Sequence, residues 1–462
     1  MVKKEDKQMK QTYSIKQKLS QMIIILLPIL VTQVGIFALS FFDTTMSGHY
    51  SPVDLAGVAV GSSLWTPIYT GLSGILLALP PIVSQLMGKN EHKGVRFSVI
   101  QAAYLSFSMA VCLLIIGYFF LDPVLTSIGL EKDVYEVTSH YLVALSTGII
   151  PIFLYFVLRS FIDSLGQTQI TMFITLIAIP INIVLNYALI NGIWIFPELG
   201  GVGTGYATSI TYWFMFFMAV YIVHKKQPFS SFQLFAHFSR MSWLKWKEIL
   251  MIGIPIGFSV FFETSIFSAV TILMSNYDTN TIAAHQSAIN FASLLYMVPL
   301  SISTALTILV GYEVGARRMK DAKIYSWLGV VLAVIIAIIS GIILLTFRTD
   351  IAGIYTKDWE VLHLTAHFLI YAIFFQLSDA IQAPIQGALR GYKDVNVTLL
   401  MSFISYWVIG LPSGYLFATY TNLGPFGYWI GLIVGLATGA IFLTSRLVQI
   451  QKKKFNYKQI HS

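Results

Sequence analysis

The sequence predicts an all-α membrane protein in which twelve transmembrane helices form two six-helix lobes related by an internal repeat. Three observations predict this fold. Hydrophobic residues make up 56% of the 462 residues, and charged residues only 11%, against roughly 25% in a soluble domain. Apolar runs long enough to cross a bilayer recur along the whole chain. The two halves of the sequence also match each other at an interval of about 227 residues.

The internal repeat aligns residues with special backbone roles. Pro28 aligns with Pro255, and Gly88 aligns with Gly315. Near the end of each copy, the glycine-containing segment 199–205 aligns with the segment 423–429. A duplicated membrane unit typically forms two bundles on either side of a central site, which is the architecture of transporters.

The predicted spans each contain about 20 apolar residues, the length that crosses a bilayer. They lie near 22–45, 57–84, 97–121, 138–159, 170–190, 201–223, 248–275, 282–310, 325–347, 362–388, 397–418 and 425–447. Six fall in each copy. An even number leaves both copies with the same orientation, so an axis along the membrane normal relates them.

These spans divide the chain into five parts. We expect a cytoplasmic N-terminal tail (1–21), an N-lobe (22–223), a cytoplasmic interlobe linker (224–247), a C-lobe (248–447) and a cytoplasmic C-terminal tail (448–462). Of the 29 Lys and Arg residues, only Lys132, Arg348 and Lys357 fall in predicted outer loops. This positive-inside pattern places both termini in the cytoplasm of a multi-pass protein of the plasma (inner) membrane.

The same distribution accounts for the net charge of +8. Because the basic residues gather in the inner loops, their partner is anionic membrane lipid and not nucleic acid. The chain has no phosphate-binding loop of the ATPase type, and its single Cys112 lies in an apolar run. The sequence therefore predicts no enzyme, no cofactor and no ATP-driven pump.

Three acidic residues lie within predicted spans: Asp43, Glu263 and Asp379. An ionised side chain costs roughly 3 kcal/mol at mid-bilayer, so such residues usually face an internal cavity on an ion or substrate pathway. We predict that all three handle the coupling cation. The alternative is a neutral, hydrogen-bonded packing acid and, for Asp43 near a helix end, a cap.

Amide and hydroxyl side chains follow helical spacing near these acids. Pairs at i and i+4 predict polar faces that line the pathway, with interhelical hydrogen bonding as the open alternative. The candidate lining residues that this spacing gives are Asn182, Asn186, Gln376 and Gln382.

The predicted spans leave these acids without a Lys or Arg partner. A proton, Na⁺ or a cationic substrate must then balance their charge, because a buried carboxylate is unfavourable alone. Two cations that compete for one negative site exclude each other, which is the physical basis of antiport.

Several segments resemble the multidrug and toxic compound extrusion (MATE) transporters, in the NorM branch. They read FFDTTMSGHYSPVDLAGVAVGSSLW (41–65), FFETSIFS (261–268), FFQLSDAIQ (374–382) and GALRGYKD (387–394). The resemblance covers nearly the whole chain. It implies efflux of small cationic, amphipathic and lipophilic drugs in exchange for Na⁺ or H⁺ as the coupling ion, and we expect a monomer.

The resemblance also assigns residues. The family's coupling-cation acids fall on Glu263 and Asp379, which implies a Na⁺ site there, and its first-helix acid, linked to drug or proton handling, falls on Asp43. The substrate-binding positions fall on Asp43, Ser63, Phe267, Gln286, Asn290 and Tyr296. Some members carry a Tyr where this chain has Phe375. Tyr371 lies one turn before Phe375, which makes it a possible substitute and a further candidate lining residue. The choice between Na⁺ and H⁺ stays open.

Three alternative functions fit the sequence less well. A flippase for a lipid-linked or polysaccharide precursor shares this topology, but an anionic headgroup calls for Lys or Arg inside the lobes, where none is predicted. A multispanning enzyme requires acids and His clustered at one face, and the His residues are scattered. A channel is disfavoured because neither copy carries a repeated filter motif.

Overall fold

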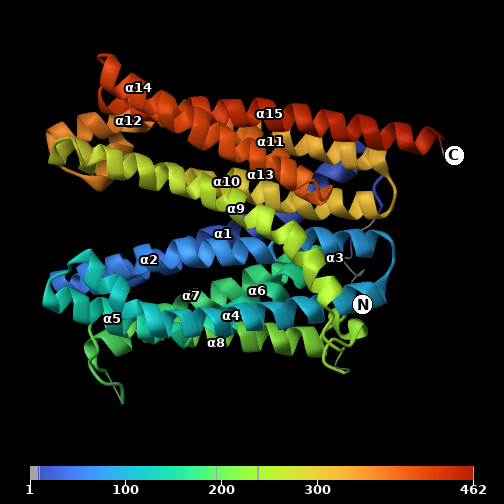
Figure 1. Ribbon diagram of the computed structural model, residues 1–462, viewed down its shortest axis with the longest axis horizontal. Helices are drawn as coiled ribbons and strands as arrows, with labels where there is room; N and C mark the ends of the chain where they lie inside the picture. Colours follow the sequence, from blue (N-terminus) through green and yellow to red (C-terminus); the bar gives the residue numbers. More distant parts are fainter. Residues whose placement is uncertain (1–8, 10, 194, 237–238, 461–462) are drawn as a thin grey trace, which may run out of the picture. The chain divides into compact units, whose positions relative to one another are not determined.

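The computed structural model describes residues 9, 11–193, 195–236 and 239–460, and every regular element in them is helical (Figure 1). The elements are α1 (Ile15–Tyr50), α2 (Pro52–Leu76), α3 (Leu79–Gly88), α4 (His92–Ile128), α5 (Lys132–Ser146), α6 (Ile149–Ser164), α7 (Thr168–Asn191), α8 (Val202–Lys225), η1 (Phe229–Phe232), α9 (Trp243–Met274), α10 (Thr279–Gly315), α11 (Met319–Tyr355), α12 (Trp359–Gly391), α13 (Asn396–Phe403), η2 (Ile404–Gly410), α14 (Leu411–Tyr420) and α15 (Pro425–Ile460). Parts of the predicted tails and linker lie outside the described residues.

The helices confirm the predicted fold class. By length and composition, 11 helices in the described chain can cross a membrane, or 12 when the bent pair α5 and α6 is one span. The two helices of that pair meet at an angle of 48°. Two further spans are composite: α2 continues into α3, and α13 continues through η2 into α14.

Capping side chains and glycines fix the ends of these helices. The Ser51 hydroxyl accepts the backbone N–H of Val53 at the start of α2, and the Asp278 carboxylate accepts that of Thr281 at the start of α10. Gly129 ends α4 with a φ of 72°, in the left-handed region that glycine enters without strain.

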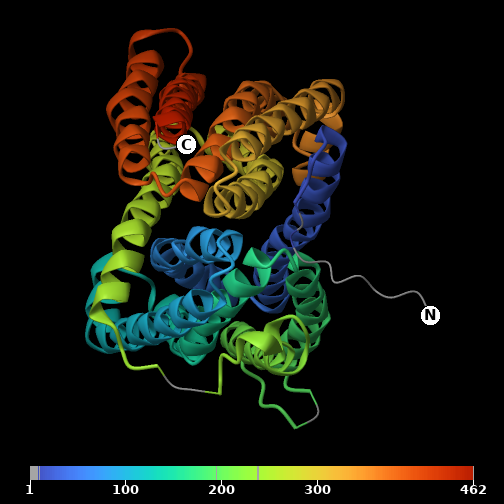
Figure 2. The ribbon, with the colours of Figure 1, turned by 90° about the vertical axis from the view of Figure 1, so that its right-hand side faces the viewer.

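The chain divides into two compact units. Unit 1 comprises Met1–Gln11 and Leu27–Gly253, and unit 2 comprises Thr12–Leu26 and Ile254–Ser462. The chain therefore passes from one unit to the other inside α1 and again inside α9 (Figure 2 shows both helices). Pro28 and Pro255, the repeat-related prolines, lie directly after these two points, where each removes a helical hydrogen bond.

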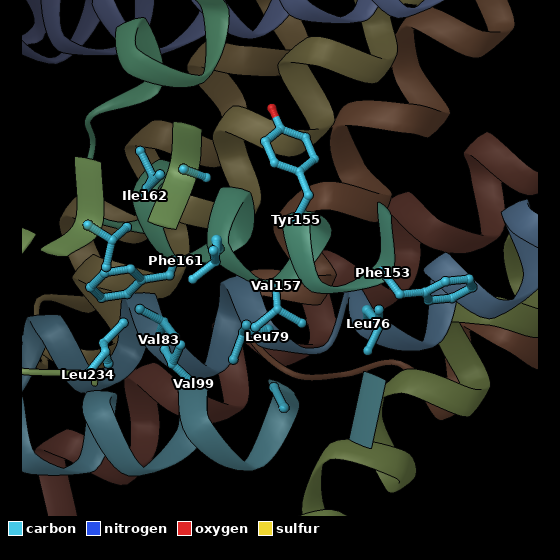
Figure 3. Close-up of a cluster of buried hydrophobic side chains, with 14 of the residues drawn as sticks. Leu76, Leu79, Val83, Val99, Phe153, Tyr155, Val157, Phe161, Ile162 and Leu234 are labelled. Carbon is cyan, nitrogen blue, oxygen red and sulfur yellow. The ribbon is translucent and has the colours of Figure 1, made fainter. Parts of the chain in front are cut away.

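Within unit 1, α8 packs against α5, α6 and α7, and α6 also packs against α3 and α4. The apolar core between these helices includes Leu76, Val83 and Val99, which face Phe153 and Phe161 of α6 (Figure 3). This core holds α6 and α8 in fixed positions around the interior of the unit.

Within unit 2, α12 packs along α10, α11 and α15. Glycines bring α14 very close to α15: a Cβ added to Gly431 would lie 2.3 Å from the Cα of Gly414. Gly431 belongs to a row of glycines on α15 that are spaced four residues apart. The other members of the row are Gly427, Gly435 and Gly439. Small residues allow the backbones of membrane helices to approach in this way.

Each unit also anchors the segment with which a helix shared by the two units begins. In unit 2, the buried Lys18 ammonium pairs with Asp321 of α11 at 2.9 Å and donates to the Thr12 carbonyl oxygen at 2.7 Å. In unit 1, the Gln101 amide of α4 donates to the Arg240 carbonyl oxygen at 2.8 Å and accepts the Ser242 N–H at 2.9 Å. The helices α4 and α11 are the third spans of their respective copies.

Candidate functional site

Unit 1 contains a closed polar network around Asp43 of α1, whose residue is 7% exposed. One carboxylate oxygen, Oδ1, accepts from the Asn186 amide at 2.7 Å, and the other, Oδ2, accepts from the Thr208 hydroxyl at 2.6 Å. The Asn186 amide also donates to Asn182 Oδ1 at 3.0 Å. The side chain thus points into the bundle and does not cap its own helix.

The two asparagines reach Asp43 because they lie at i and i+4 on one face of α7, as the spacing predicted. Thr208 comes from α8 and was missed. A threonine in an apolar span is commonplace, and its hydroxyl often bonds to its own helix. The sequence therefore gave no signal that singled it out.

Unit 2 contains the other two acids, on α9 and α12. Glu263 of α9 is 7% exposed, and its Oε1 accepts from the Tyr296 hydroxyl of α10 at 3.0 Å. Asp379 of α12 is 1% exposed and interacts electrostatically with Glu263. Its Oδ2 has no hydrogen-bond partner among the described residues.

The prediction that these acids lack a resident basic partner is wrong for Glu263. Arg390 lies in the last turn of α12, is buried, and interacts electrostatically with Glu263. The predicted span ended at residue 388, before Arg390. In the structure α12 continues to Gly391, and both Arg390 and Gly391 are buried. The Arg390 guanidinium also donates to Gln386 Oε1 at 3.1 Å. One cation thus accompanies two carboxylates in unit 2.

The glutamines of α12 separate into two roles. Gln376 donates to the Ala292 carbonyl oxygen of α10 at 3.3 Å, which joins the two helices. Gln382 lies one turn after Asp379 on the same face, and its amide nitrogen bonds to the Tyr406 hydroxyl. Both glutamines are buried, so the polar stripe faces protein and not lipid.

Apart from Asp43, the predicted substrate-binding residues occupy more accessible positions. Gln286 and Asn290 are exposed on α10, and Asn290 Oδ1 accepts from the Tyr355 hydroxyl at 3.1 Å. Phe267 is half-buried, with its ring centroid 5.6 Å from that of Phe375. Ser63 is exposed on α2 of unit 1, where its hydroxyl donates to the backbone of its own helix.

Tyr371, the candidate substitute for the missing tyrosine, points elsewhere. Its ring stacks on Phe426, with centroids 5.5 Å apart and planes 14° from parallel. No hydrogen bond joins Tyr371 to Glu263 or Asp379 within the described chain. The tyrosines that do interact with these acids are Tyr296 and Tyr406. Tyr406 was missed, because it lies in an apolar run without a polar pattern around it.

The acids of the two units differ in the hydrogen bonds that their carboxylate oxygens accept. Both oxygens of Asp43 accept hydrogen bonds from neutral donors, whereas Asp379 keeps an oxygen that is buried and unpartnered. A buried polar atom without a partner is rare and calls for an ion, a proton or water to complete it. The duplicated bundles and these buried acids define the class: a polytopic membrane transporter.

Comparisons with known proteins agree with this class. The sequence model of the MatE family matches residues 28–188 and 255–416, once in each half. The chain is 55% identical over 451 residues to the "Probable multidrug resistance protein NorM" of Bacillus subtilis, which spans 98% of this chain and 100% of that protein. The protein of the same name from Oceanobacillus iheyensis is 56% identical over 96% of this chain and 100% of its own.

Solved structures share the fold. The crystal structure of the eukaryotic MATE transporter AtDTX14 covers 95% of this chain and 98% of its own, with a TM-score of 0.85 and 18% identity. A MATE crystal structure in the bent conformation gives a TM-score of 0.86 at 19% identity, covering 95% of this chain and 97% of that one. The chain belongs to the MATE family, which confirms the resemblance found in the sequence.

Proposed function

We propose that this protein is a secondary active multidrug efflux antiporter that exports small cationic, lipophilic compounds in exchange for Na⁺ or H⁺. The observation that carries the proposal is the buried, unpartnered Asp379 oxygen beside Glu263. The curated relatives, named as probable multidrug resistance proteins, support drugs as the exported class.

The coupling follows from the charge of unit 2. Glu263, Asp379 and Arg390 together leave a net negative charge around the two carboxylates, which favours an entering monovalent cation. Once an ion is bound there, a cationic drug is less favourable in the same unit, so the drug leaves outward. Exchange of one entering monovalent ion for one leaving drug of charge +1 moves no net charge, so the concentration gradient of the ion drives export. A tenfold ion gradient then supports about a tenfold drug gradient.

Asp43 supplies a second point of control in unit 1. Protonation would convert one of its acceptor oxygens into a donor. Either the Thr208 hydroxyl must then reverse its direction, or the Asn186 amide must leave. We propose that this exchange of partners changes the interior of unit 1 and links proton or drug handling to the packing of α1.

The location and orientation of the protein in the membrane are also part of the proposal. Both termini lie in the cytoplasm of a protein of the plasma membrane, since the basic residues gather on that side. The proposal includes the division into two tails, two lobes and a linker, and a monomeric protein. The flippase alternative is not favoured, because the buried guanidinium is already engaged by Gln386 and outnumbered by acids.

An ion-swap measurement tests this function. Ethidium export from cells or inverted vesicles is followed under a Na⁺ gradient alone and then under a pH gradient alone. We expect one gradient to drive export, and Glu263→Gln and Asp379→Asn to abolish it at normal expression. Asp350→Asn, at an exposed position of α11, is the control and should export normally. Normal export by both acid variants would overturn the assignment.

A further inference from the structure

A π-helix interrupts the span formed by residues 396–420. This element, η2, comprises seven residues from Ile404 to Gly410, between α13 and α14. π-Helices are rare, and they concentrate at functional sites because the extra residue redirects neighbouring side chains. Here two consecutive aromatic residues, Tyr406 and Trp407, reach two different helices of unit 2.

Trp407 reaches the helix that carries Glu263. Its indole N–H donates to the Phe262 carbonyl oxygen at 3.3 Å, and Phe262 directly precedes Glu263 in α9. The Phe262 ring also packs against Phe403, the residue before η2, at a centroid distance of 5.0 Å. These contacts fix the backbone of α9 at the position that bears the first carboxylate.

Tyr406 reaches the helix that carries Asp379. The residue is 1% exposed, and its hydroxyl bonds to the amide nitrogen of Gln382, one turn from Asp379. Its hydroxyl also interacts electrostatically with both Glu263 and Asp379. Tyr406 therefore supplies a phenolic oxygen near the acids, which the Phe375 position cannot do.

Oxygen atoms in this region lack partners. Asp379 Oδ2, Gln382 Oε1 and Ser405 Oγ are buried and form no hydrogen bond with any described residue. A buried polar group that is left without a hydrogen bond is unfavourable. Oxygen is the ligand that hard cations prefer. Unpartnered oxygens on α12 and η2 thus indicate that both elements contribute to the surroundings of an ion.

The glycines of α15 make this arrangement sterically feasible. A Cβ at Gly439 would lie 2.5 Å from Gln382 Oε1, and one at Gly435 would lie 3.1 Å from the Ser405 carbonyl oxygen. Larger residues would push α12 and η2 away from α15. The row of glycines therefore sets how closely Gln382 of α12 and Tyr406 of η2 can approach α15.

We propose that η2 positions the cation site of unit 2. Trp407 holds Glu263 through the Phe262 carbonyl, and Tyr406 holds the Asp379 side through Gln382. These contacts set the separation of the two carboxylates, and thereby the affinity of the site for its coupling ion. The inference rests on the proposed function, because it assigns new positioning residues to the same site.

The test separates ion affinity from turnover. Purified wild-type protein in liposomes is assayed for ethidium transport while the driving ion, Na⁺ or H⁺, is titrated. For Tyr406→Phe, which removes only the hydroxyl, we expect the half-saturating ion concentration to change about tenfold, with the maximal rate within about twofold. Trp407→Phe should shift the same quantity by a few-fold. Tyr415→Phe, on the exposed face of α14, is the matched control and should behave as wild type.

The outcomes are distinguishable. Should Tyr406→Phe fold poorly, Gln382→Met removes the same hydrogen bond from the other side and should give the same shift. An unchanged half-saturating concentration in Tyr406→Phe and Trp407→Phe, or a loss of maximal rate alone, overturns the positioning role. If wild type shows no ion-driven transport, the proposed function itself fails. If Asp379→Asn alone abolishes coupling while the η2 variants match wild type, only this inference fails.

Discussion

At the scale of single residues, the contrast between Asp43 and Asp379 is the most informative feature. Asp43 is enclosed by three neutral partners, directly by Asn186 and Thr208 and through them by Asn182. Asp379 is more deeply buried, yet it keeps an oxygen without a partner. The first arrangement can accept a proton by exchanging hydrogen-bond partners, whereas the second calls for an entering cation.

Thr208 tests the network around Asp43. Thr208→Val keeps the shape of the side chain but removes the hydroxyl, so Asp43 Oδ2 loses its 2.6 Å bond. A hydrogen bond to a charged group contributes about 1.5–3 kcal/mol. We expect ethidium export to fall about tenfold or more, and its pH profile to shift. Thr208→Ser restores the hydroxyl and should export normally. Equal export and an equal pH profile in the Val variant would argue against the network.

The acids of the site were predictable from the sequence, whereas only some of their partners were, among them Asn186 and Tyr296. Asp43, Glu263 and Asp379 stand out because a charge in an apolar span is costly wherever it occurs. Tyr406 and Arg390 do not stand out, because their roles depend on which helices meet in space. Long-range packing of this kind leaves no periodic signal in a single sequence.

At the scale of elements, the anchor of α1 in unit 2 should carry stability. Lys18→Met removes the ammonium from Asp321, whose side chain is 25% exposed. Breaking a fully buried pair costs about 3–5 kcal/mol, and the partial exposure of Asp321 reduces this to about 1–3 kcal/mol. We expect a lower midpoint of thermal unfolding in detergent for Lys18→Met. Lys16→Met, exposed on the same helix, should melt like wild type, and equal midpoints for both would contradict the anchor.

The contact between α14 and α15 should tolerate no side chain at Gly431. Its Cβ would lie 2.3 Å from the Gly414 Cα, and backbone atoms cannot move aside as a flexible side chain can. Gly431→Ala should destabilise the protein by about 1–3 kcal/mol, the usual cost of overpacking. Gly71→Ala is the control, since a Cβ there meets nothing within 4 Å. A midpoint of unfolding unchanged by Gly431→Ala would show that the two helices can separate freely.

Hydropathy located the spans but not their internal breaks. Each predicted span falls on a helix or a composite span of the structure. The bend between α5 and α6 and the π-helix η2 were not predicted, because α- and π-helical turns of apolar residues have the same composition. Such breaks arise from tertiary contacts, for example the Trp407 indole bond to α9.

At the scale of the whole molecule, the distribution of charge predicts the orientation in the membrane. In a Cys112→Ala background, single cysteines are placed by Lys132→Cys and Lys320→Cys. A membrane-impermeant maleimide added to intact cells should label residue 132 and leave residue 320 unlabelled, since positive loops stay inside. Permeabilised cells supply the control, in which both positions label. The reverse pattern in intact cells would invert the proposed topology.

In the proposed mechanism, ion and drug exclude each other because of the acids in unit 2. Ethidium binding to purified protein is measured at increasing Na⁺, and separately at decreasing pH. We expect one of these ions to weaken ethidium binding to the wild type, and Asp379→Asn to remove this effect. Ethidium binding that is insensitive to both ions, or equally sensitive in wild type and Asp379→Asn, would contradict it.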